Sequence, residues 1–300
     1  MRSLHHTGLG IIRILVQNTT DRVDVHHIDA IERHPRTLYI SNHMDIVREA
    51  AIINYALAQN DLPLAHLAAG DNLFKNRIIR PLLALQPLFP VPRGKGQGLA
   101  IAAAVEAQLS QGNHTWVAQG PGRSRSGRIE THPNLLINLA AAHGTSIAEY
   151  LAATNVVPVS VSAEYEPAAK QMAYLAAGKT KSKVDDLSAC ASGIFGSKGR
   201  ISIAFMPRIR HADSALEASA AVDKAIIGGY ELYPTHIAAY KERSRVPIEE
   251  WSTYPVDTRA LDDAYIVEQV RNLPAAVAPH LVMRYAMPVL QKKQDCGSKR

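Results

Sequence analysis

The sequence predicts an α/β fold: a single domain with a mostly parallel or mixed central sheet flanked by helices, and with a helical C-terminal extension. Short apolar segments alternate with helical patterns over about 200 residues, which is typical of a sheet covered on both faces. One of these segments, 156–161 (VVPVSV), is the continuous apolar run of a strand buried on both faces. The 300 residues, 47% of them hydrophobic, suffice for a large buried core.

The chain order suggests three segments. We expect an N-terminal helical segment (1–22), an α/β domain (23–240) and a helical extension (241–300) packed on the same domain. The extension is interrupted by prolines and ends in a charged tail.

Each element follows from a local pattern. Residues 8–17 have the periodicity of an amphipathic helix, and 23–28 alternates apolar and polar residues as a half-buried strand does. The prolines in 88–93 restrict that segment to an edge strand. Further strands are expected at 38–40, 114–119, 156–161 and 200–206, and further helices at 45–57, 73–80, 99–110, 134–154 and 214–232. Gly193, Gly196 and Gly199 predict a turn before the strand at 200–206.

Composition restricts the class of protein. The two cysteines, Cys190 and Cys296, are far apart, so the pattern favours neither a disulfide framework nor a zinc site, and we expect a reducing compartment. No apolar run approaches the roughly 18–20 residues of a membrane span, and the apolar stretch 8–16 is interrupted by Arg13, unlike a signal peptide. We therefore expect a cytoplasmic protein, peripheral on the inner face of the cell membrane.

The charge balance favours anionic partners. The chain has 33 basic and 27 acidic residues, a formal charge of +6, which suits phospholipid headgroups, coenzyme A phosphates or nucleic acid. Nucleic acid is the weakest of these because basic and aromatic residues are not interleaved.

The triplet Ser41-Asn42-His43 lies between the strand at 38–40 and a helix that begins near Asp45. A histidine at such a corner is held by rigid elements and still faces the crevice beyond the strand ends, as a general base must. Asp45 is a good N-cap residue for the helix. The pattern therefore predicts a catalytic role for His43.

A second polar loop, 120–128, follows the strand at 114–119. It contains Arg123, Arg125 and Arg128, and three arginines in six positions need an anion or water. In an open α/β sheet this loop, His43 and Arg93 all emerge at the carboxyl ends of strands. We expect them to converge on one site.

Taken together, these motifs resemble the glycerophospholipid acyltransferase superfamily, and more closely a bacterial subgroup of 1-acylglycerol-3-phosphate or glycerol-3-phosphate acyltransferases. The resemblance covers nearly the whole chain, through SNHMDIV, GDNLF, FPVPR, WVAQGPGRSRSG, NVVPVSVSAEYEP, DDLSACASGIFGSKGRI, YELYPTHIAAY and RYAMPVL. It implies transfer of a fatty acyl group from acyl-CoA or acyl carrier protein, at a membrane lipid surface, to a glycerol hydroxyl.

The resemblance also implies roles for individual residues. His43 matches the general base, and Arg93 matches the arginine that ends the second motif. Gly122 and Arg123 match the third motif, which binds the acceptor phosphate, and we expect Arg125 to contribute to that binding. Pro158 matches the fourth motif.

The family's acid, five positions after the histidine, is here replaced by Arg48, with Asp45 and Glu49 on either side. We expect Glu49 to orient His43 and Asp45 to cap the helix, because the longer Glu49 side chain reaches back to the ring. Met44 and Pro121 also replace charged residues of the family pattern. These departures leave a second hypothesis open, a non-catalytic lipid- or phosphate-binding relative.

The chemistry implied requires neither a metal nor a cofactor. A neutral imidazole takes the proton of the attacking hydroxyl, and a carboxylate fixes the tautomer of the ring. We expect backbone N–H groups near Asp45 and Ile46 to stabilise the oxyanion.

Overall fold

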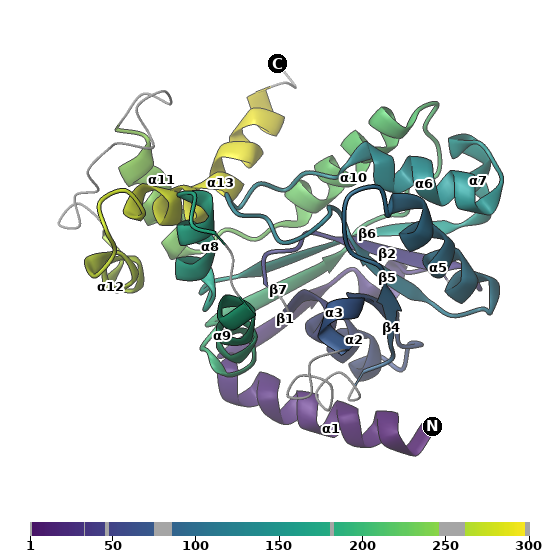
Figure 1. The fold of residues 1–300 in the computed structure, drawn as a ribbon, viewed down its shortest axis with the longest axis horizontal. Helices are drawn as coiled ribbons and strands as arrows, with labels where there is room; N and C mark the ends of the chain where they lie inside the picture. The colour runs from purple at the N-terminus through teal and green to yellow at the C-terminus, as the bar shows by residue number, and fades with distance from the viewer. Residues whose placement is uncertain are drawn as a thin grey trace.

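The computed structural model describes residues 2–32, 34–45, 48–74, 86–180, 183–245 and 262–297. Its strands form one seven-stranded sheet in the order β1-β7-β6-β2-β5-β3-β4 (Figure 1). Only β6 and β7 are antiparallel, and the other neighbours are parallel. The predicted α/β class with a mixed sheet is confirmed. The strands are β1 (Arg22–His26), β2 (Thr37–Ser41), β3 (His66–Gly70), β4 (Leu88–Val91), β5 (Thr115–Ala118), β6 (Asn155–Ala163) and β7 (Arg200–Phe205).

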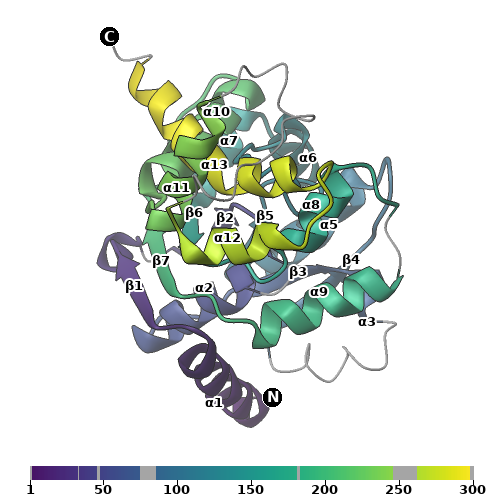
Figure 2. The ribbon, with the colours of Figure 1, turned by 90° about the vertical axis from the view of Figure 1, so that its left-hand side faces the viewer.

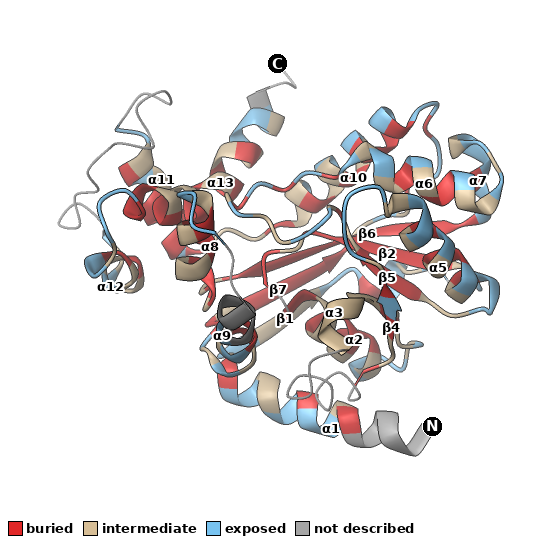
Figure 3. Cartoon of the chain, in the orientation of Figure 1, coloured by how far each residue is buried: buried red, intermediate tan, exposed pale blue. Residues whose placement is uncertain are grey.

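Helices cover both faces of the sheet (Figure 1). Apolar side chains alternate along β2, so that Leu38 and Ile40 pack with α5, α6 and α10 on one face, whereas Tyr39 packs with α2 on the other. Every residue of β6 is buried, as its continuous apolar sequence predicts (Figure 3). The helices are α1 (Arg2–Thr19), η1 (Ile28–Ala30), α2 (Arg48–Gln59), α3 (Asp71–Phe74), α5 (Gly98–Ser110), α6 (Pro133–His143), α7 (Ile147–Ala153), α8 (Ala169–Ala176), α9 (Lys183–Phe195), α10 (Ala215–Gly229), α11 (Pro234–Arg243), α12 (Ala264–Arg271) and α13 (Ala278–Gly297).

The C-terminal helices are not a separate body. α11, α12 and α13 share an apolar cluster with Ala169 and Ala173 of α8 (Figure 2). One face of α13 therefore belongs to this cluster, and the helix runs on toward α10 and the loop after β5.

The structure divides the helix expected at 134–154 into α6 and α7, because Gly144 adopts a left-handed conformation between them. Of the helix expected at 73–80, only the part within α3 is described, and residues 75–85 lie outside the described part of the chain. Gly193 lies inside α9 instead of in a turn, and a Cβ at this position would lie only 2.5 Å from Oδ1 of Asp45. The glycine allows α9 to approach the His43 corner. Within the described residues, no helix combines the length and the apolar character that crossing a membrane requires.

Candidate active site

The Ser41-Asn42-His43 corner follows β2, in the middle of the sheet. Asn42 is fully buried, and its side-chain amide bonds both backbone groups of Val161 in β6, at 2.7 and 2.9 Å. From β5, the indole Nε1 of Trp116 donates to the Ser41 hydroxyl at 2.9 Å. The Trp116 and His43 rings meet edge to face, with centroids 6.0 Å apart. Both neighbouring strands therefore fix the corner.

His43 contacts a buried carboxylate from the first turn of α2. Its Nδ1 lies 3.3 Å from Oε2 of Glu49, whose side chain is fully buried, while 18% of the His43 side chain is exposed. Arg48 donates to the other carboxylate oxygen, from Nη2 at 2.7 Å and from Nε at 3.2 Å. Because Nδ1 faces Glu49, Nε2 is the ring nitrogen left for a substrate.

The partners of Glu49 hold it in the ionised form. Burial alone raises the pKa of the Glu49 carboxyl, but the Arg48 guanidinium and the His43 hydrogen bond more than offset this and lower the pKa to about 2. For Arg48, burial lowers the pKa, and the nearby carboxylates, Glu49 first among them, raise it above its ordinary value. The imidazole therefore faces a permanent negative charge.

Asp45 has a different role from Glu49 in this geometry. Its Oδ1 accepts a hydrogen bond from the Arg48 N–H at 3.1 Å, the bond expected of an N-cap side chain. Its own N–H donates to Glu49, at 3.1 and 3.3 Å to the two oxygens. The Asp45 N–H is thus engaged and is not the oxyanion donor we expected; Ile46 lies outside the described residues.

A cavity of about 190 Å³ opens beside His43. Its wall is the loop after β5, and the N–H of Ser124 in this loop donates to the His43 carbonyl at 2.8 Å. Arg128 lines the cavity and pairs with Glu130 at 3.0 Å. The lining residues are His43, Gln119, Gly120, Pro121, Gly122, Ser124, Ser126, Arg128 and Glu130.

The other predicted binding residues lie at different distances from this cavity. Gly122 lines it, whereas Arg123 is half-buried and Arg125 exposed in the same loop. Arg93 follows β4 at the sheet edge, where its Nη1 donates to Asn72 Oδ1 at 3.2 Å. Three strand spacings of about 4.8 Å separate β4 from β2, so Arg93 is on the order of 14 Å from the corner.

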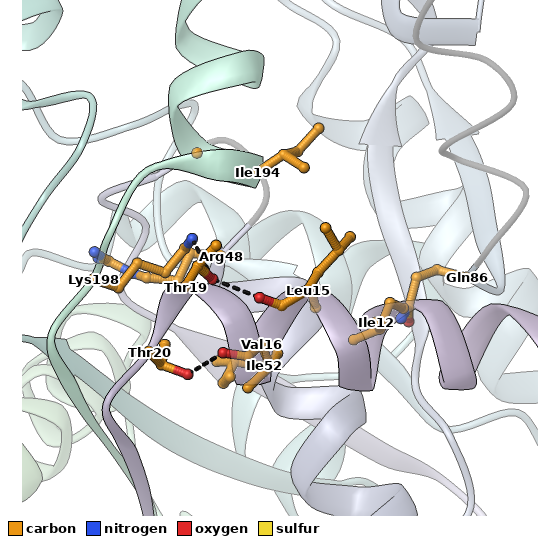
Figure 4. Close-up of a pocket in the computed structure, with 12 residues that line it drawn as sticks. Ile12, Leu15, Val16, Thr19, Thr20, Arg48, Ile52, Gln86, Ile194 and Lys198 are labelled. Carbon is orange, nitrogen blue, oxygen red and sulfur yellow. Dashed lines mark hydrogen bonds between the residues drawn. The ribbon is translucent and has the colours of Figure 1, made fainter.

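A second, apolar pocket lies on the other side of α2, between α1 and α9 (Figure 4). It encloses about 90 Å³. Arg48 borders this pocket and at the same time pairs with Glu49. Lys198, also in the wall, donates to Thr19 Oγ1 at 3.1 Å, and burial lowers the pKa of its amine to about 8. The other lining residues are Ile12, Leu15, Val16, Thr20, Ala51, Ile52, Gln86, Gly193 and Ile194.

Residues 22–162 match the family model described as Acyltransferase. This segment is an acyltransferase domain. The resemblance seen in the sequence motifs is thereby confirmed at the level of the family. The chain is also similar to a solved structure, the 1-acyl-sn-glycerophosphate (LPA) acyltransferase PlsC from Thermotoga maritima, with 14% identity, a TM-score of 0.46 and coverage of 75% of this chain and 76% of that one. No curated protein matches the chain.

The acyltransferase domain contains β1 to β6, the His43 corner, Glu49 and the loop at 120–130. Two groups that touch this site were missed by sequence reasoning. The sequence motif gives Asn42 no role of its own, whereas in the structure its buried amide joins the corner to β6. Arg284 lies in α13, outside the matched segment, and although it begins the stretch RYAMPVL, that stretch assigns it no role. No group of three or more His, Cys, Asp or Glu side chains suited to a metal ion occurs in the described part of the chain.

Proposed function

We propose that this acyltransferase moves a fatty acyl group from acyl-CoA or acyl carrier protein to a hydroxyl of glycerol 3-phosphate or of a lyso-glycerophospholipid. The observation that carries the proposal is the His43–Glu49 pair, an imidazole on a cavity wall with a buried, ionised carboxylate at its Nδ1. The acyltransferase match of residues 22–162 supports it.

In the proposed reaction, Nε2 of His43 takes the proton of the acceptor hydroxyl while that oxygen attacks the thioester carbonyl. Glu49 stabilises the imidazolium that forms, as the acid of a Ser-His-Asp triad does. The tetrahedral intermediate then collapses, the C–S bond breaks, and the imidazolium returns its proton to the leaving thiolate. The products are an ester and a free thiol, and no protein nucleophile, metal or cofactor takes part.

We assign the acceptor phosphate to the arginines of the 120–128 loop. Arg128 is the arginine on the cavity wall, and Arg123, which the family pattern marks, lies five residues earlier in the loop. A guanidinium matches phosphate oxygens with two parallel N–H donors. Arg125, exposed in the same loop, can contribute to this binding, whereas Arg93 at the sheet edge suits the phosphates of the donor.

We assign the end of the acyl chain to the apolar pocket under α2. Its wall is formed by aliphatic side chains such as Leu15, Ile52 and Ile194 (Figure 4). Arg48, also in the wall, pairs with Glu49 beside the base. Exposed Ile11 and Ile14 on the outer side of α1 suit contact with a lipid surface.

The decisive experiment is an acyl-transfer assay in which the release of free thiol is measured for a small panel of donors and acceptors. His43→Ala should lose roughly 10²–10⁴-fold in kcat, the contribution of a general base, while the melting temperature stays near that of the wild type. A wild type that binds lipid or phosphate but transfers no acyl group would identify a non-catalytic relative. Equal turnover by wild type and His43→Ala would reject the mechanism.

A further inference from the structure

We infer that α13, although outside the acyltransferase match, completes the active site, and that Arg284 is the positioning residue that holds the 120–128 loop against the His43 corner. This inference rests on the proposed function for its kinetic consequences. Arg284 is 1% exposed, among the largest fully buried side chains of the described chain. A cation buried this deeply needs several acceptors.

The acceptors of Arg284 come from both sides of the cavity. Its Nη2 donates at 2.9 Å to the carbonyl of Met44, the residue after the base. Its Nη1 donates to the carbonyl of Ser124 in the loop, and at 3.4 Å to that of Arg125. One planar guanidinium thus joins the corner to the loop.

The contacts of Arg284 compensate its buried charge. The carbonyl oxygens of Met44 and Ser124 accept from the two terminal nitrogens of one guanidinium, so loss of the cation would leave both without these donors. Glu166, 5% exposed, balances the charge by accepting from Arg284 Nε at 2.5 Å. A lysine would provide a single point charge in place of a fork that spans four acceptors.

Two further contacts dock the loop on α13. Gly127 has a φ of 79°, and a Cβ there would collide with the carbonyl oxygen of Arg284, so the loop backbone lies directly on the helix. Further along, the side-chain amide of Gln291 bonds both backbone groups of Ile129, accepting at 2.9 Å and donating at 2.8 Å. The loop that lines the cavity beside His43 therefore takes its shape from α13.

The test separates loop position from folding. We propose Arg284→Lys, which keeps the charge, and the pair Arg284→Gln with Glu166→Gln, which removes both buried charges together. Leu281→Ala is the control, because Leu281 is on the same helix and packs in the C-terminal apolar cluster. Hydrogen exchange of segment 120–128, thermal melting, and KM for acceptor and donor are measured for each.

Both Arg284 variants should exchange the Ser124 amide about tenfold faster and lose roughly 10²-fold in kcat/KM for the acceptor, with KM for the donor almost unchanged. Leu281→Ala should melt earlier and leave the ratio of the two KM values as in the wild type. Wild-type exchange of the loop in a folded Arg284 variant would overturn the inference, as would equal effects on both substrates. Hydrogen exchange can be measured without turnover. If the wild type is inactive on every substrate and the Arg284 variants still exchange faster, the proposed function is rejected and the inference about the loop stands.

Discussion

At the scale of single residues, the buried pair of Arg48 and Glu49 determines how the role of the carboxylate is tested. Glu49→Gln alone leaves the Arg48 guanidinium buried without its counter-charge, a loss of about 3–5 kcal/mol. We therefore predict that Arg48→Met combined with Glu49→Gln folds, and that its kcat falls roughly 10²–10⁴-fold. The measurement is steady-state turnover together with thermal melting.

Asp45→Asn is the matched control, because asparagine also caps a helix. It should keep kcat within about threefold of the wild type, since its side chain bonds the Arg48 N–H. An inactive Asp45→Asn beside an active double variant would transfer the orienting role to Asp45.

Two arginines of the loop, Arg128 and Arg123, are predicted to bind the acceptor. Arg128→Ala should raise KM for the acceptor by about 10-fold or more with kcat nearly constant, because the guanidinium lines the cavity beside His43. Arg123→Ala should have a similar effect, because Arg123 matches the arginine of the family's third motif. Effects of equal size on acceptor and donor would reject the phosphate assignment for that arginine.

Asp223 predicts a pH dependence of stability. Burial raises the pKa of its carboxyl to about 6, although hydrogen bonds from Thr131 oppose the shift. Because the folded pKa lies above the unfolded value of 3.8, its stabilising contribution is complete below pH 3.8 and is lost as the pH rises through 6.

Asp223→Asn accepts the same hydrogen bonds without charge. Its melting temperature should therefore rise relative to that of the wild type as the pH goes from 5 to 7. The expected gain is roughly 2–4 °C, because solvent screens part of the effect. The exposed Glu268→Gln should show no such trend. A constant difference across this range would argue against a buried, strained carboxylate.

At the scale of elements, α1 has one inward and one outward apolar side. Ile12 is 5% exposed, while Ile14 is 58% exposed. We predict that Ile14→Glu weakens binding to anionic vesicles at least severalfold without lowering the melting temperature, and that salt weakens wild-type binding. Binding that ignores both the substitution and the ionic strength would place the lipid contact elsewhere.

The apolar pocket lined by α1, α2 and α9 predicts selectivity for the length of the acyl chain. Ala51→Phe would fill the pocket from the α2 side, so the preferred acyl group should shorten by a few carbons while KM for the acceptor stays constant. The measurement is competition between thioesters of different length. An unchanged preference would show that the chain lies outside this pocket.

At the scale of the whole molecule, sequence patterns predicted what depends on nearby residues. The strand, the corner and the cap were predictable because His43, Asp45 and Glu49 lie within six positions of one another. The burial of β6 was predictable from its unbroken apolar run. The ion pair of Arg48 was not predicted, since the family position suggested an acid and charge pairing depends on the course of the helix.

Contacts between remote segments were beyond such reasoning. Gly193 suggests a turn in a local pattern, yet it lies in α9, where it is a glycine because Asp45, from the corner after β2, occupies the space of a side chain. Arg284 is one of many arginines in the sequence, and only the fold brings it to Met44, 240 positions away. Which of Arg123 and Arg128 lines the cavity beside His43 depends likewise on how a long loop folds.

The anchoring of the 120–128 loop by Arg284 of α13 also affects when the active site forms during synthesis. The ribosome makes Arg284 160 residues after Ser124, and at roughly 5–20 residues per second that interval lasts on the order of 8–32 s. During synthesis the sheet and the His43 corner can assemble while the loop still lacks its anchor. A nascent chain would therefore consume acyl donor far more slowly until α13 emerges, so that translation itself delays the onset of full turnover.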